Sequence, residues 1–137
     1  MPRRRPAQVR AQLPFRRPPP VRQIPRVSAL TTRCVAELER ARFRTGRTAE
    51  ALEGWARFVR GPSAAIARYR IELNPCPCCD DDDPAVGRAF LRTVLNTLPA
   101  KAARELLELV RPLDRLYLAR SSPTPEHAEL RALLTCR

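Results

Sequence analysis

Apolar side chains recur three and four positions apart along most of the chain from residue 28 onward. Residues at this spacing share one face of an α-helix, so the pattern predicts a series of amphipathic helices. The apolar stripes are Leu30, Cys34, Leu38 and Ala41; Leu52, Trp55, Ala56 and Val59; Val86, Phe90, Leu91, Val94 and Leu95; Ala103, Leu106, Leu107 and Val110; Leu113, Leu116 and Tyr117; and Leu130, Leu133 and Leu134.

Start and stop signals divide the first half of this region into two helices. Ser28 is a good N-cap for the first stripe, and that helix is predicted to end near Gly46. Thr48 is the predicted N-cap of the second helix. The dipeptide Gly61-Pro62 then supplies a C-terminal glycine followed by a proline, which is a strong stop signal.

Residues 63–73 are compatible with either a strand or a helix. Apolar and charged residues alternate there, as expected of a strand. Ile66, Tyr69 and Leu73 also fall at helical spacing behind Ser63, which can act as an N-cap. The chain offers no second convincing strand to pair with the first, so a helix is predicted.

Three later helices begin at or beside a proline, a residue that is favoured at the first helical position. The start signals are Asp83-Pro84, Pro99 and Thr124-Pro125-Glu126. Pro112 is predicted to kink the helix that follows Pro99 or to start another. The sequence therefore predicts an all-α fold, a small bundle of five to seven short helices, with residues 28–137 as one domain.

Residues 1–27 have a different composition from the rest of the chain. They hold eight arginines, seven prolines and no acidic residue, whereas the whole protein has a formal net charge of +12. Dense proline removes backbone donors, and the segment has few apolar side chains to bury, so a disordered N-terminal arm is predicted. Its candidate polyanion-binding residues are Arg3, Arg4, Arg5, Arg10, Arg16, Arg17, Arg22 and Arg26.

The arm favours a partner that carries negative charge. Arginines bind phosphate oxygens without reading the base sequence, so nucleic acid or a nucleoprotein complex is the expected partner. An acidic protein surface is one alternative, and a compositionally biased tail without a dedicated partner is another. The stretch from Pro14 to Pro20 also has the composition of a polyproline ligand with basic flanks.

One cluster in the chain has metal-ligand chemistry. Cys76, Cys78 and Cys79 precede four aspartates, 80–83, in a predicted loop between two helices. The C-x-C-C spacing differs from the paired ligands of standard zinc sites, and a fourth ligand would have to come from elsewhere. The three hypotheses are a zinc site, a redox pair, and unreactive thiols packed under the loop. The neighbouring aspartates oppose thiolate formation and so argue against a nucleophile.

No motif in the chain indicates catalysis. There is no G-x-x-x-x-G-K-[ST] sequence for a nucleotide, and four glycines do not form a G-x-G-x-x-G loop. His127, the sole histidine, is predicted to have a surface or capping role. Trp55 and Phe58 are predicted to lie in or beside the core. Apolar runs are too short for a membrane span, and the odd number of cysteines without an export signal predicts a cytoplasmic protein.

These patterns together predict a small non-enzymatic binding protein. Its basic arm is expected to contact nucleic acid, a nucleoprotein complex or an acidic protein surface without sequence specificity. The alternative interpretation is a zinc- or redox-responsive interaction protein that uses the loop of Cys76, Cys78 and Cys79.

Overall fold

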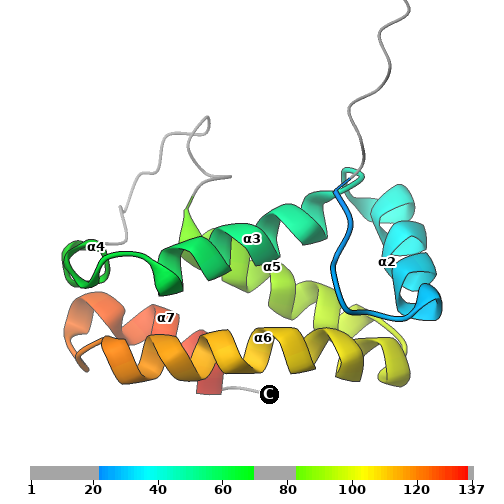
Figure 1. The fold of residues 1–137 in the computed structure, drawn as a ribbon. Helices are drawn as coiled ribbons and strands as arrows, with labels where there is room; N and C mark the ends of the chain where they lie inside the picture. Colours follow the sequence, from blue (N-terminus) through cyan, green and yellow to red (C-terminus); the bar gives the residue numbers. More distant parts are fainter. Residues whose placement is uncertain (1–21, 70–82, 136–137) are drawn as a thin grey trace, which may run out of the picture.

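The computed structural model describes residues 22–69 and 83–135, and within these residues the fold is entirely helical. This confirms the all-α prediction, and no strand occurs in the described part of the chain. The helices are α2 (Ala29–Arg42), α3 (Arg47–Arg60), α4 (Ser63–Arg68), α5 (Pro84–Thr97), α6 (Ala100–Arg120) and α7 (Ala128–Thr135), with a 3₁₀ turn, η2 (Pro125–His127), before the last (Figure 1).

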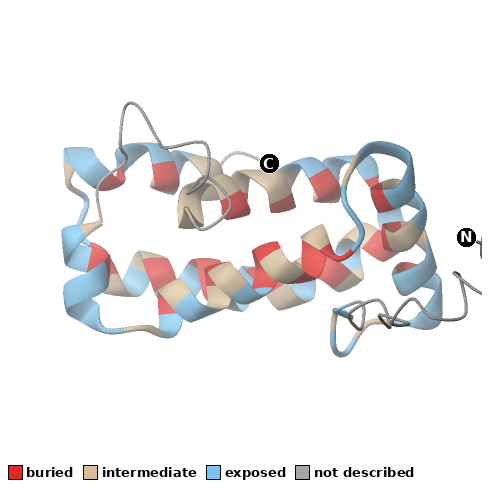
Figure 2. Ribbon diagram, turned by 90° about the horizontal axis from the view of Figure 1, so that it is seen from above, coloured by how far each residue is buried: buried red, intermediate tan, exposed pale blue. Residues whose placement is uncertain are grey.

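Helices α3, α5 and α6 form the centre of the bundle. α3 packs mainly against α5 and also against α6, and the 21-residue α6 lies along the side of the bundle opposite α4 and α3 (Figure 1). α2 crosses one end and contacts α6, while α7 packs against α5. Buried positions line the facing sides of the helices and exposed positions lie on their outer sides (Figure 2).

The core is mostly aliphatic and surrounds two large aromatic side chains. Trp55 and Tyr117 are fully buried, and their ring centroids lie 5.3 Å apart. Phe58 packs beside them at the edge of the core, so the predicted placement of Trp55 and Phe58 is confirmed. The remaining fully buried aliphatic side chains come from five helices: Val59, Ile66, Leu91, Val94, Leu106, Val110 and Leu130.

A charged pair lies inside this core and joins three helices. Arg88 on α5 donates from Nε and Nη2 to the two carboxylate oxygens of Asp114 on α6, at 2.9 and 2.8 Å. Trp55 on α3 donates from its indole Nε1 to the same carboxylate at 3.0 Å. The Arg88 residue is only 4% exposed. Burying such charges is tolerable because each is paired and hydrogen-bonded to the other.

The start of α2 agrees with its predicted cap, but its buried face differs from the prediction. The Ser28 side chain accepts a hydrogen bond from the backbone N–H of Thr31, as expected of an N-cap. The buried side chains of α2 are Thr31, Val35 and Glu39, whereas Leu30 is 46% exposed. Two polar residues can occupy this face because both have hydrogen-bond partners there.

A carboxylate from α6 completes the N-terminal cap of α2. Glu105 accepts hydrogen bonds from the backbone N–H of Ser28 at 2.8 Å and from the hydroxyls of Ser28 and Thr31 at 3.0 and 2.8 Å. The bond from the Ser28 N–H contributes most to holding the pKa of the Glu105 carboxyl below its usual value of 4.5, and the two hydroxyls add to it. The ionised carboxylate is thus the form that stabilises the fold.

Substituting the Glu105 carboxylate is expected to lower the stability of the protein at neutral pH but much less in acid. Because the pKa of Glu105 is lower in the folded state, its stabilisation is complete above about pH 4.5 and is lost as the pH falls through the folded-state pKa. Glu105→Gln is therefore expected to differ most from the wild-type protein at neutral pH, and this difference should shrink in acid. Urea unfolding followed by circular dichroism across this range measures it, with the exposed Glu108→Gln as control. A pH-independent difference between wild type and Glu105→Gln would contradict it.

The start of α3 corrects a sequence prediction. Thr48 is not an N-cap: it lies inside the helix and is buried, and the cap position is Gly46, with φ of 83°. The capping acceptor is the carboxylate of Glu39 from α2, which accepts from the backbone N–H of Gly46 at 2.7 Å and of Thr48 at 2.8 Å. A negative group at a helix N-terminus is favourable, and only glycine adopts this left-handed backbone freely.

The end of α3 is held by an arginine from α6. The helix ends at Arg60, as the Gly61-Pro62 signal predicted. The Arg120 guanidinium donates to the carbonyl oxygens of Val59 and Gly61, the latter at 2.7 Å, and to the Ser63 hydroxyl at 3.1 Å. A cation here complements the negative end of the helix dipole.

Four other helix boundaries agree with the sequence prediction in part. Asp83 caps α5 and Pro84 is its first residue, which confirms that start signal. Ser63 is not a cap but the first residue of α4, which ends at Arg68 and not near residue 73. Residues 70–73 lie outside the described residues.

α6 runs without interruption through Pro112, so this proline does not start a new helix. The Thr124-Pro125-Glu126 signal opens η2, and α7 follows it directly.

Candidate polyanion-binding cleft

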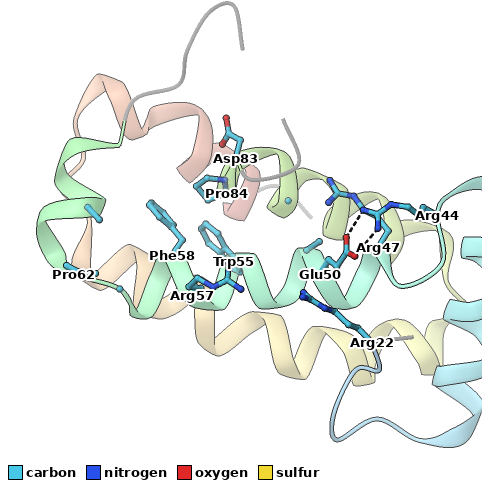
Figure 3. Close-up of a pocket in the computed structure, with 15 residues that line it drawn as sticks. Arg22, Arg44, Arg47, Glu50, Trp55, Arg57, Phe58, Pro62, Asp83 and Pro84 are labelled. Atoms are coloured by element: carbon cyan, nitrogen blue, oxygen red, sulfur yellow. Dashed lines mark hydrogen bonds and ion pairs between the residues drawn. The ribbon is translucent and has the colours of Figure 1, made fainter. Parts of the chain in front are cut away.

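A cleft of about 680 Å³ opens along the outer side of α3 (Figure 3). Its floor is formed by α3, its sides by the chain before α2, the α2–α3 turn and the start of α5, and one end by α4. It is lined by Arg22, Arg44, Arg47, Glu50, Ala51, Gly54, Trp55, Arg57, Phe58, Gly61, Pro62, Ala65, Asp83, Pro84 and Gly87. The cleft thus gathers residues that are up to 65 positions apart in the sequence.

Four arginines from three segments line the cleft, against two carboxylates. Arg22 precedes α2, Arg44 lies in the α2–α3 turn, and Arg47 and Arg57 belong to α3. Arg22, Arg44 and Arg57 are exposed to solvent. A concave surface lined mainly by one sign of charge raises the local concentration of ligands with the opposite charge.

Ion pairs hold two of these arginines in place. Arg44 forms a two-bond pair with Glu50, at 2.9 and 2.6 Å, and Arg22 pairs with Glu53 at 2.8 Å. The hydrogen bonds from Arg44 are the main cause that keeps the pKa of the Glu50 carboxyl below its usual value. The Arg47 guanidinium carbon lies 5.2 Å from the centre of the Phe90 ring. These contacts orient the guanidinium groups, although exposed ion pairs add little stability.

The end of the cleft that lies away from Arg44 and Arg47 is mainly apolar. Phe58, Pro62 and Pro84 line it, the fully buried Trp55 lies beside Phe58, and Arg57 lies next to Trp55 (Figure 3). The one carboxylate at this end, Asp83, is engaged within the fold. The cleft therefore has a cationic end and an end suited to a flat or apolar group.

Asp83 also connects the two sides of the segment that carries the cysteines. Its Oδ1 accepts from the Tyr69 hydroxyl and from the backbone N–H of Ala85, both at 2.8 Å. Partial burial, with the neighbouring Asp83 carboxylate, raises the pKa of Tyr69 far above its usual range, so the hydroxyl remains a donor. Tyr69 and Asp83 are the last and first described residues on either side of 70–82.

The predicted metal ligands Cys76, Cys78 and Cys79 lie outside the described residues, so the zinc and redox hypotheses stay predictions. Within residues 22–69 and 83–135, no three His, Cys, Asp or Glu side chains are grouped so as to hold a metal ion. In that same part of the chain, no helix is long and apolar enough to cross a membrane.

Of the eight predicted arm arginines, the structure describes two. Arg22 lines the cleft, and Arg26 is exposed with a positive φ of 63°. The other six (Arg3, Arg4, Arg5, Arg10, Arg16 and Arg17) lie outside the described residues. Between the two described arginines, Ile24 packs against the core, so the end of the arm is in contact with the helical body.

The position of His127 differs from its predicted surface or capping role. The residue is 3% exposed, and its Nδ1 lies 2.6 Å from the Tyr117 hydroxyl in the core. Burial raises the pKa of that hydroxyl, which therefore stays protonated at neutral pH. His127 is the last residue of the η2 turn, and its neighbours in the sequence carry no signal for such a contact.

The cleft residues of the helical body were also missed at the sequence level. Thr45 and Gly46 separate Arg44 from Arg47, and mainly acidic and apolar residues separate Arg47 from Arg57, so their spacing does not mark a basic patch. A usable signal is the high density of arginine between residues 40 and 47, where four of eight residues are arginine. No family model matches this chain, and no curated protein or solved structure matches it.

Proposed function

We propose that this protein is a non-enzymatic, cytoplasmic binding protein that holds nucleic acid, alone or in a nucleoprotein complex, through its arginine-rich arm. The arm contacts the phosphates and supplies affinity without base specificity. The odd number of cysteines suits a reducing compartment.

The observation that supports this function best is the position of Arg22 at the cleft. Arg22 is one of the eight arm arginines and the first residue that the structure describes, and it lines the cleft together with Arg44, Arg47 and Arg57. The arm therefore joins the helical body at a basic surface. A phosphate chain bound by the arm would lie close to the cleft arginines, so the arm and the cleft would attract the same polyanion.

The salt dependence of binding tests this proposal. If all eight arm arginines contact phosphates, the slope of log affinity against log salt should be about −7 for duplex DNA. Changing Arg3, Arg4, Arg5, Arg10, Arg16 and Arg17 to glutamine should make the slope less steep by about 5, because six phosphate contacts are lost. Fluorescence anisotropy of a labelled duplex at several salt concentrations measures both slopes.

A charge-matched control separates the arm from net charge alone. Six exposed arginines of the helical body line no part of the cleft: Arg33, Arg40, Arg68, Arg104, Arg111 and Arg115. Changing these six to glutamine removes the same charge and should alter the slope much less. An equal change in the two variants would show that the arm has no dedicated role, and the proposed function would then be wrong.

A further inference from the structure

We propose that the cleft along α3 is a binding site for single-stranded nucleic acid, with phosphates at its cationic end and an unpaired base at its apolar end. This inference rests on the proposed function and adds to it a preference that the arm alone does not provide. Arginine contacts from a flexible arm act on any phosphate chain, whereas a shaped cleft selects among chains.

The two ends of the cleft match the two parts of a nucleotide. Arg22, Arg44 and Arg47 lie toward one end, where Arg44 and Glu50 form their ion pair (Figure 3). Phe58 and Pro84 lie toward the other end, and Arg57 lies near them (Figure 3). The Phe58 ring packs against the rings of Trp55, Tyr69 and Tyr117 and is only partly exposed to the cleft. Proteins that bind single strands combine such a cationic groove with an aromatic surface for the bases.

The floor of the cleft contains a glycine that helix packing does not explain. Gly54 lies in the middle of α3, where glycine is unfavourable relative to alanine, yet a Cβ there would meet no atom within 4 Å. By contrast, a Cβ at Gly87 on α5 would meet the backbone of Ala51 at 3.7 Å. A Cβ at Gly87 would thus be in ordinary van der Waals contact with α3, whereas a Cβ at Gly54 would enter open space above the floor.

The open space at Gly54 lies between the cationic and apolar ends of the cleft. A ligand that reaches from Arg44 to Phe58 must pass over it. In a duplex the base faces are stacked against their neighbours, so the apolar end has no base to receive. A single strand offers both phosphates and free base faces, and it is therefore the form that uses the whole cleft.

The experiment compares the full-length wild-type protein with Gly54→Leu, using an oligothymidylate and a duplex of the same length. Leucine is a better helix former than glycine and enters open space, so the variant should fold while its side chain fills the floor. Gly54→Ala keeps most of the space, and Ala119→Leu introduces a leucine at an exposed site on α6 outside the cleft. Trp55, the sole tryptophan, reports occupancy through its emission.

The wild-type protein should bind the single strand about tenfold more tightly than the duplex, the size expected for one stacked base. Gly54→Leu should lose this preference and the change in Trp55 emission, while keeping its duplex affinity. Gly54→Ala and Ala119→Leu should behave as the wild type does.

Equal wild-type affinities for the two probes, or an unchanged preference in Gly54→Leu, would overturn the cleft inference. Either result leaves the arm proposal in place, because the salt slope on duplex tests it separately. A wild-type protein that binds neither probe would overturn both.

Discussion

Replacing Asp114 with alanine is expected to destabilise the protein by about 3–5 kcal/mol, because Arg88 would remain buried without its counterion. The carboxylate also accepts from the indole of Trp55, so the substitution leaves donors on two helices without an acceptor. The Arg88 Nη1 already has no hydrogen-bond partner within the described residues, which makes Asp114 its main source of stabilisation. Urea unfolding followed by circular dichroism gives the free energy of unfolding.

A double variant distinguishes the loss of the pair from the loss of packing. Arg88→Met combined with Asp114→Leu removes both charges and keeps apolar volume, and it should be much closer to the wild type than Asp114→Ala. The control is Glu108→Ala, at an exposed position on the same helix. It should change the free energy of unfolding by less than about 0.5 kcal/mol. If Asp114→Ala lowered the free energy of unfolding by less than about 1 kcal/mol, the prediction would be wrong, because water would then solvate the Arg88 guanidinium in place of Asp114.

The second large effect is expected at Glu39. Glu39→Ala should destabilise the protein by about 2–4 kcal/mol, because the backbone N–H groups of Gly46 and Thr48 would lose a charged acceptor. All three residues are buried, so solvent reaches these donors poorly. The free energy of unfolding in urea again provides the measurement.

Glu37 supplies the matched control for Glu39. It lies two positions earlier on α2 and is exposed, so Glu37→Ala removes the same side chain and should have little effect. Near-equal losses in the two variants would show that helix propensity, and not the cap on α3, controls the result. Glu39→Gln retains one acceptor oxygen and is expected to fall between Glu39→Ala and the wild type.

Local signals in the sequence were sufficient for the fold class and for several helix starts. Ser28 and the Asp83-Pro84 pair act within one turn of their helices, and both were assigned correctly. The apolar stripe around Trp55 and Val59 was also buried as expected. These interactions join residues that are close in the chain, so a single sequence contains all the information they need.

The sequence predictions were wrong where a residue distant in the sequence supplied the hydrogen-bond partner. Thr48 has the side chain of a good cap, but Glu39 supplies the acceptor for its N–H and Thr48 lies inside the helix. α2 buries Thr31 and leaves Leu30 exposed because Glu105, 74 positions from Thr31, accepts its hydroxyl. His127 was assigned to the surface because nothing near it in sequence indicates the contact with Tyr117.

The sequence by itself determined an all-α fold, the order of its helices and the high positive charge of residues 1–27. Periodicity, caps and composition are properties of neighbouring residues, and they survive whatever the chain packs against. Only the tertiary structure decided that Arg22, Arg44 and Arg57 share one cleft above Gly54, and that Arg88, Asp114 and Trp55 form one buried network. Those groupings depend on how α3, α5 and α6 pack, because residues far apart in the chain acquire common partners only when their helices meet.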